Sequence, residues 1–183
     1  MESKDTLVVN LYAGPSTGKS STMAGLFAEL KWRGLDCEMA PEFAKEKVWE
    51  GSLGILENQI YIFAKQLHSI NRLLGKVEVV ITDSPLLFSL IYGKKMGDPF
   101  KNLVLDIFNQ HRNLNIFLKR LKTFNPNGRL QSEEEAKAID KDLLALLARY
   151  NVDYVSMDSH PLTIPTLADI VTDVIGKDKF LYS

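Results

Sequence analysis

Short apolar runs alternate along the chain with longer segments in which apolar side chains recur every three or four positions. The runs are the length of buried strands, and the longer segments have the period of amphipathic helices. We expect strands over 7–12, 35–40, 76–82, 115–118 and 152–157. We expect helices over 20–31, 52–74, 86–91, 100–111, 132–150 and 167–175. Strands joined by helices form parallel sheets, so the predicted class is α/β, in a three-layer sandwich.

Two of the predicted helices have further features. Ser132 and Glu135 have the spacing of a capping box, which predicts a helix start at this point. The segment 52–74 is the longest amphipathic stretch, and its apolar stripe can serve either the core or a homodimer. The sequence leaves the oligomeric state open.

The first strand runs directly into a loop of small residues that ends in Gly-Lys-Ser. Its residues are Ala13, Gly14, Pro15, Ser16, Thr17, Gly18, Lys19, Ser20 and Ser21. A loop of this kind before a helix cradles phosphates with its amide groups, with Lys19 on the β- and γ-phosphates and the Ser20 hydroxyl on Mg²⁺. Ala13 stands where the strict pattern has glycine. The alternative is an ordinary glycine-rich turn between a strand and a helix.

Two carboxylates are expected at the same edge of the sheet, because each follows a strand. Asp83 comes after the strand 76–82, and Ser84 and Pro85 can cap and begin the next helix in its place. Asp83 is therefore predicted to hold Mg²⁺ through water or to accept a hydroxyl proton. Glu42 ends the second strand and could share these tasks. The alternatives are a cap for Asp83 and a solvated charge for Glu42.

The segment 119–131 combines basic residues with an Asn-Pro-Asn-Gly turn. In a nucleotide enzyme, it would be a lid whose Arg120 or Arg129 closes over the phosphates. The alternative is a solvated basic loop.

Composition narrows the possible functions. The chain has 183 residues, of which 45% are hydrophobic and 25% charged, and we expect a single domain over 1–183. The net charge of −1 does not favour duplex DNA as an obligate partner. A single cysteine, a polar N-terminus and the absence of a long apolar run lead us to expect a cytoplasmic protein with no membrane contact. The three histidines lie far apart in the sequence, so we expect the metal to be Mg²⁺ held by oxygen ligands.

The motifs together resemble P-loop kinases of the nucleoside and nucleotide kinase-like type. More narrowly, the chain resembles small phage and bacterial ATP-binding proteins grouped with the kinase domain of the nicotinamide-riboside kinase regulators. The matching segments are 13–21, 41–46, 81–85 and 125–129. The resemblance implies a sheet of order 2-3-1-4-5, ATP on the loop, Asp83 as the catalytic or Mg²⁺-linked acid, Glu42 at the acceptor and Arg129 in the lid.

Departures from the related families leave the acceptor open. Ser84 stands where deoxynucleoside kinases have arginine, and Lys45 stands where the regulators usually have arginine. The segment 125–129 is also similar to the lid of phage kinases that phosphorylate a hydroxymethylated base within DNA, which would place the protein in the host cytoplasm if a phage encodes it.

Three hypotheses follow. The first is an ATP-dependent kinase that transfers the γ-phosphoryl group to a hydroxyl or phosphate of a nucleoside-like or nucleotide-like acceptor. The second is a P-loop ATPase that acts as a switch and has no small acceptor. The third is the DNA base kinase, for which DNA would contact Lys94, Lys95, Arg120 and Lys122.

Overall fold

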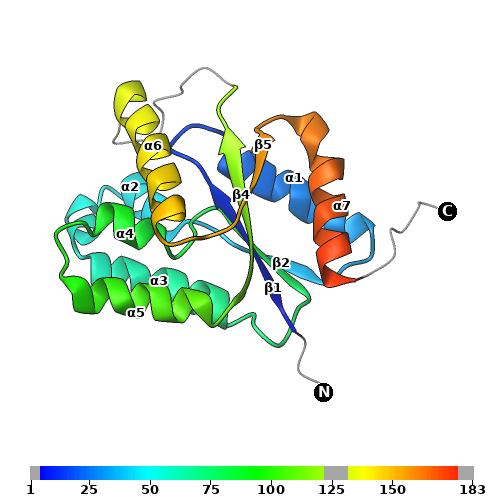
Figure 1. Ribbon diagram of the computed structural model, residues 1–183, viewed down its shortest axis with the longest axis horizontal. Coiled ribbons are helices and arrows are strands. Elements are labelled where there is room, and N and C mark those ends of the chain that lie inside the picture. Colours follow the sequence, from blue (N-terminus) through cyan, green and yellow to red (C-terminus); the bar gives the residue numbers. More distant parts are fainter. Residues whose placement is uncertain (1–4, 122–131, 177–183) are drawn as a thin grey trace.

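The computed structural model describes residues 5–121 and 132–176, which form a sheet of five parallel strands between two layers of helices (Figure 1). The strand order is β2-β3-β1-β4-β5. The strands are β1 (Leu7–Tyr12), β2 (Cys37–Ala40), β3 (Val79–Thr82), β4 (Arg112–Lys119) and β5 (Val155–Asp158). The predicted α/β class and the order 2-3-1-4-5 are confirmed.

The helices divide between the two faces of the sheet. Helices α1 (Lys19–Trp32) and α7 (Ile164–Ile175) cover one face. The other face is covered by α3 (Gln59–Asn71), α4 (Phe88–Tyr92), α5 (Asp98–Asn109) and α6 (Glu133–Arg149). Successive side chains of a strand point to opposite faces, so Val9 of β1 packs toward α1 and α7, while Val8 packs toward α3 to α6. Both faces of β1 are therefore core.

The predicted starts of two helices had different outcomes. At α6 the Glu135 amide donates to the Ser132 hydroxyl over 3.2 Å and the Ser132 amide donates to the Glu135 carboxylate over 2.7 Å, so the capping box is confirmed. The predicted helix cap at Ser84 is wrong. Helix α4 begins only at Phe88, after a turn in which the Phe88 amide donates to the Pro85 carbonyl over 2.9 Å.

The segment 52–74 is not one helix. It contains a short 3₁₀ helix, η1 (Leu53–Glu57), and then α3, because the Asn58 side chain accepts from the Tyr61 amide over 3.1 Å and starts a new helix. Ile60, which belongs to the predicted apolar stripe, is 56% exposed. The sequence analysis also missed α2 (Phe43–Trp49), which follows β2 and has no buried residue.

Several boundaries differ by a few residues from those predicted. Strand β4 begins three residues early because its polar side chains find partners: the Asn10 side chain donates to Asn113 over 2.9 Å and to Asn115 over 3.1 Å. Helix α7 also begins three residues early, with Pro165 in its first turn, and β5 begins three residues late. Within the described residues, no helix is long and apolar enough to cross a membrane.

Candidate functional site

The loop between β1 and α1 has the backbone geometry of an anion-binding loop. Ser16 has a φ of 62° and Gly18 a φ of 108°, and left-handed residues of this kind turn successive amides toward one side. Helix α1 starts at Lys19 with no side-chain cap and no acidic residue in its first turn. Its first amides and its positive dipole end are therefore directed at the hollow of the loop, where they favour an anion.

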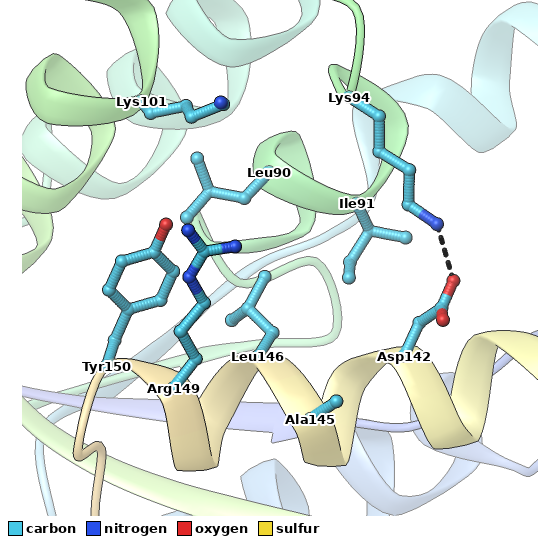
Figure 2. Close-up of a pocket in the computed structure, with 9 residues that line it drawn as sticks. All are labelled: Leu90, Ile91, Lys94, Lys101, Asp142, Ala145, Leu146, Arg149 and Tyr150. Carbon is cyan, nitrogen blue, oxygen red and sulfur yellow. Dashed lines mark hydrogen bonds and ion pairs between the residues drawn. The ribbon is translucent and has the colours of Figure 1, made fainter. Parts of the chain in front are cut away.

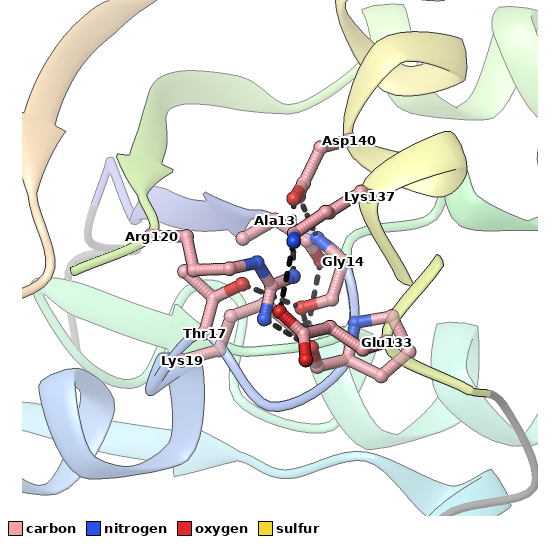
Figure 3. Close-up of polar contacts among 9 residues, drawn as sticks. Ala13, Gly14, Thr17, Lys19, Arg120, Glu133, Lys137 and Asp140 are labelled. Atoms are coloured by element: carbon pink, nitrogen blue, oxygen red, sulfur yellow. Dashed lines mark hydrogen bonds and ion pairs between the residues drawn. The ribbon is translucent and has the colours of Figure 1, made fainter. Parts of the chain in front are cut away.

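Lys19 is held across this loop (Figure 3). Its ammonium donates to the Ala13 carbonyl over 2.8 Å and to the Gly14 carbonyl over 3.2 Å, and it lies 5.5 Å from the centre of the Phe88 ring. The Lys19 residue is only 9% exposed. A charge with so little water around it interacts strongly with an anion that enters the loop.

The structure brings Ser20 and Asp83 together, as the sequence analysis expected. The Ser20 hydroxyl donates to one carboxylate oxygen of Asp83 over 2.5 Å, and the Glu42 amide donates to the other over 3.0 Å. Asp83 is buried. Mg²⁺ prefers hard oxygen ligands and usually binds through one or two protein groups together with phosphate oxygens and water. The Ser20 hydroxyl and the Asp83 carboxylate fit that requirement.

Glu42 reaches this site through its backbone. It occupies the N-cap position of α2 and is half-buried, and its amide donates to Asp83. The role of its carboxylate at the acceptor stays a prediction.

The sequence analysis missed Gln66, a buried residue of α3 that joins both acid-bearing loops. Its side chain donates to the Ala40 carbonyl over 3.3 Å and to the Thr82 hydroxyl over 3.2 Å, and it accepts from the Phe43 amide over 3.3 Å. Ala40 and Phe43 flank Glu42, and Thr82 precedes Asp83. The available signal was a polar residue within the apolar stripe of the helix.

Arg120, which follows β4, lies against the phosphate loop (Figure 3). It donates to the Pro15 carbonyl over 2.9 Å and to the Asp140 carboxylate over 3.0 Å. Within the described part of the chain, its buried Nε atom has no hydrogen-bond partner. An anion in the loop could accept from that atom. Arg129 and most of the predicted lid lie outside the described residues.

The sequence analysis also missed Asp140 of α6. Its carboxylate accepts from the Gly14 amide as well as from Arg120, and so links the phosphate loop to α6 (Figure 3). The contact is close, since a Cβ atom on Gly14 would lie 2.3 Å from the Ala136 carbonyl oxygen. The signal was an acidic residue four positions after Ala136, on the buried face of the helix.

A small cavity of about 110 Å³ adjoins the first turns of α1. Its lining residues are Ser21, Thr22, Gly25, Ser159, His160, Pro161 and Ile164. The loop after β5 comes close to the phosphate loop here, since a Cβ atom on Gly18 would lie 2.5 Å from the Ser159 hydroxyl oxygen. Ser159 therefore lines this cavity and also packs against the anion-binding loop.

Two of the four cations considered for DNA, Lys94 and Arg120, each pair with an acid of α6. Lys94 pairs with Asp142 over 2.6 Å and Arg120 pairs with Asp140 over 3.0 Å. Successive residues of an α-helix are rotated by about 100° around its axis, so Asp140 and Asp142, two positions apart, face opposite sides of α6. Lys122 lies outside the described residues.

Comparison with known proteins supports the same assignment of the loop. A family model described as "AAA domain" matches residues 8–162. No curated protein matches the chain. Among solved structures, the "Crystal structure of NadR protein in complex with NR" superposes with a TM-score of 0.73 at 15% sequence identity, over 98% of this chain and 53% of that chain. The two share a fold, and this chain spans about half the length of the other.

Proposed function

The chain belongs to the AAA domain family, and from that premise we propose that it is an ATP-dependent phosphotransferase acting on a nucleoside-like acceptor. One observation carries the proposal. A single buried carboxylate, that of Asp83, contacts the phosphate-loop serine with one oxygen and the start of the neighbouring α2 with the other. It therefore stands between the place for the nucleotide phosphates and a second, adjoining region.

The proposed nucleotide is ATP with Mg²⁺. Its phosphates would lie on the loop amides, the first turn of α1 and Lys19, and its base would occupy the cavity beside Ser159 and His160. Mg²⁺ would be held by Ser20 and Asp83, and when bound it would offset phosphate charge. Arg120 would contribute its Nε donor to a phosphate oxygen.

The acceptor would approach from the side of α2. The solved NadR structure is a complex with NR, which supports a nucleoside-like molecule as the acceptor here. Glu42 begins α2, and either its carboxylate or that of Asp83 would orient the acceptor hydroxyl and take its proton. Phosphoryl transfer depends mainly on positioning and on neutralising charge, which the loop amides, Lys19 and Arg120 would provide.

The test is transfer from γ-labelled ATP with Mg²⁺. The acceptors are nucleosides, nucleoside monophosphates, nicotinamide riboside and DNA with hydroxymethylated bases, each compared with water. Label on a nucleoside-like acceptor supports the proposal, and label on DNA alone would indicate the base kinase. Release of free phosphate only, whatever the acceptor, would contradict the proposal and indicate an ATPase switch.

Variants tie the activity to this site. Lys19→Met keeps an apolar stem over Phe88 but removes the charge, and we expect transfer to fall at least about 100-fold. Lys141→Met is the control, because Lys141 is exposed on α6 and lies outside the site. Near-normal transfer by Lys19→Met would refute the assignment of the loop.

A further inference from the structure

A second cavity, of about 320 Å³, lies between the end of α4, the start of α5 and the second half of α6 (Figure 2). This volume is within the range of small-molecule sites. None of its lining residues belongs to the nucleotide site described above. Its acid, Asp142, lies two positions after Asp140 on α6 and therefore faces away from the phosphate loop.

The cavity combines an apolar floor with cationic walls. Leu90, Ile91 and Leu146 form much of the floor, and all three are buried. Figure 2 shows Lys101, Arg149 and Tyr150 gathered at one end, and Lys94 paired with Asp142 at the other. The Arg149 guanidinium lies 5.5 Å from the centre of the Tyr150 ring, which helps to keep it at the cavity.

Two positive charges thus act at one end of this cavity. Lys101 pairs over 2.9 Å with Asp98, whose side chain is 84% exposed. The pKa of Asp98 is lowered by the hydrogen bond from Lys101, by the charge of Lys101 and, to a smaller degree, by the charge of Arg149. Ion pairs this exposed are weak, so an anion within the cavity can compete for Lys101.

We propose that this cavity binds a small amphipathic anion, namely a ring system bearing a phosphate or a similar oxyanion. The anionic group would lie between Lys101 and Arg149, and the ring would cover the floor formed by Leu90, Ile91 and Leu146. A bare phosphate would leave the apolar floor exposed to water, and a neutral ring would give Lys101 and Arg149 no anion to bind. Neither half of such a ligand alone matches the cavity.

The test is binding of phenyl phosphate, compared with inorganic phosphate and phenol, by titration calorimetry and ligand-observed NMR. Saturating Mg²⁺ and a non-hydrolysable ATP analogue are present throughout, so that the phosphate loop is filled. We expect saturable binding of phenyl phosphate, tighter than that of either fragment. No saturable binding, or equal binding of phenyl phosphate and inorganic phosphate, would overturn the proposal.

Two variants that should change the Kd in opposite directions test whether the ligand binds in this cavity. Arg149→Gln should raise the Kd of phenyl phosphate about tenfold, the size of one lost charged hydrogen bond. Asp142→Asn removes the negative charge of the wall and releases Lys94, so it should lower the Kd several-fold, a result that general destabilisation would not give. Lys141→Gln, on the same helix but outside the cavity, should leave the Kd unchanged. Equal effects of Arg149→Gln and Lys141→Gln, or weaker binding by Asp142→Asn, would place the ligand elsewhere.

Discussion

The close contact between the phosphate loop and α6 makes Gly14→Ala the most informative single substitution. The new Cβ atom would lie 2.3 Å from the Ala136 carbonyl oxygen and 3.0 Å from an Asp140 carboxylate oxygen. Ordinary contact begins at 3.4 Å, so the loop or the helix must move by about 1 Å. The obstructing carbonyl is backbone within a helix and cannot rotate away as a flexible side chain can.

The displacement lowers the free energy of unfolding in two ways. Inserting a methyl group into a well-packed contact costs about 1–3 kcal/mol. Moving the loop also weakens the hydrogen bond from the Gly14 amide to Asp140, a bond to a charged group. The reduced flexibility of the unfolded chain offsets about 0.4–1 kcal/mol of this loss. We therefore expect the free energy of unfolding to fall by about 2–3 kcal/mol, which corresponds to roughly 4–12 °C in Tm for a chain of this length.

The assay is urea unfolding with a thermal melt, alongside the matched control Gly54→Ala. A Cβ atom on Gly54 would meet nothing within 4 Å, and its φ is not positive, so this control should be neutral or slightly stabilising. ATP binding should weaken only for Gly14→Ala, because its loop must shift. Equal stability of the two variants would show that the loop does not approach α6 this closely.

Three further predictions concern polar groups inside the fold. Asp140→Asn keeps an acceptor for the loop amide but places an uncharged amide against Arg120. The free energy of unfolding, measured in urea, should fall by about 1–2 kcal/mol. An unchanged urea midpoint would contradict the ion pair. Gln66→Leu removes the hydrogen-bond partner of the Phe43 amide, the Ala40 carbonyl and the Thr82 hydroxyl. The free energy of unfolding should fall by about 2–3 kcal/mol, and the KM for the phosphoryl acceptor should rise. A normal KM would show that Gln66 does not set the position of the acid-bearing loops. Burial raises the pKa of Cys37 to about 11, above its ordinary value of 9.0, so the thiol should react slowly with a thiol reagent at pH 8 until the protein is unfolded. Because unfolding releases a proton between these pKa values, stability should fall as the pH rises from 9 toward about 11, and Cys37→Ala should lack that component in urea titrations at several pH values.

Features that depend on neighbouring residues were predictable from the sequence. The β1 strand, the phosphate loop and the start of α1 form one continuous segment whose apolar run, glycines and lysine act within a few residues of one another. The capping box of α6 spans four residues and formed as expected. The alternation of strands and helices gave the class of the fold, since parallel strands need crossovers.

Local patterns failed where a competing contact decided the outcome. The apolar stripe of 52–74 has helical spacing, but the Asn58 side chain binds the Tyr61 amide and starts a new helix there. Strand β4 begins before the predicted Asn115 and includes Asn113, because the side chains of both asparagines accept hydrogen bonds from Asn10 on the neighbouring strand β1. In both places a side-chain hydrogen bond outweighed the periodicity.

The amino-acid sequence by itself determined the class of the fold, the phosphate loop and the expectation that Ser20 and Asp83 would meet at one edge of the sheet. Only the tertiary structure revealed the roles of Asp140 and Gln66. Asp140 binds Gly14, which lies 126 residues away in the chain, and Gln66 binds Phe43, which lies 23 residues away. A hydrogen bond depends on the distance between donor and acceptor atoms in the folded protein, and a local sequence pattern does not determine the distance between residues that are far apart in the chain.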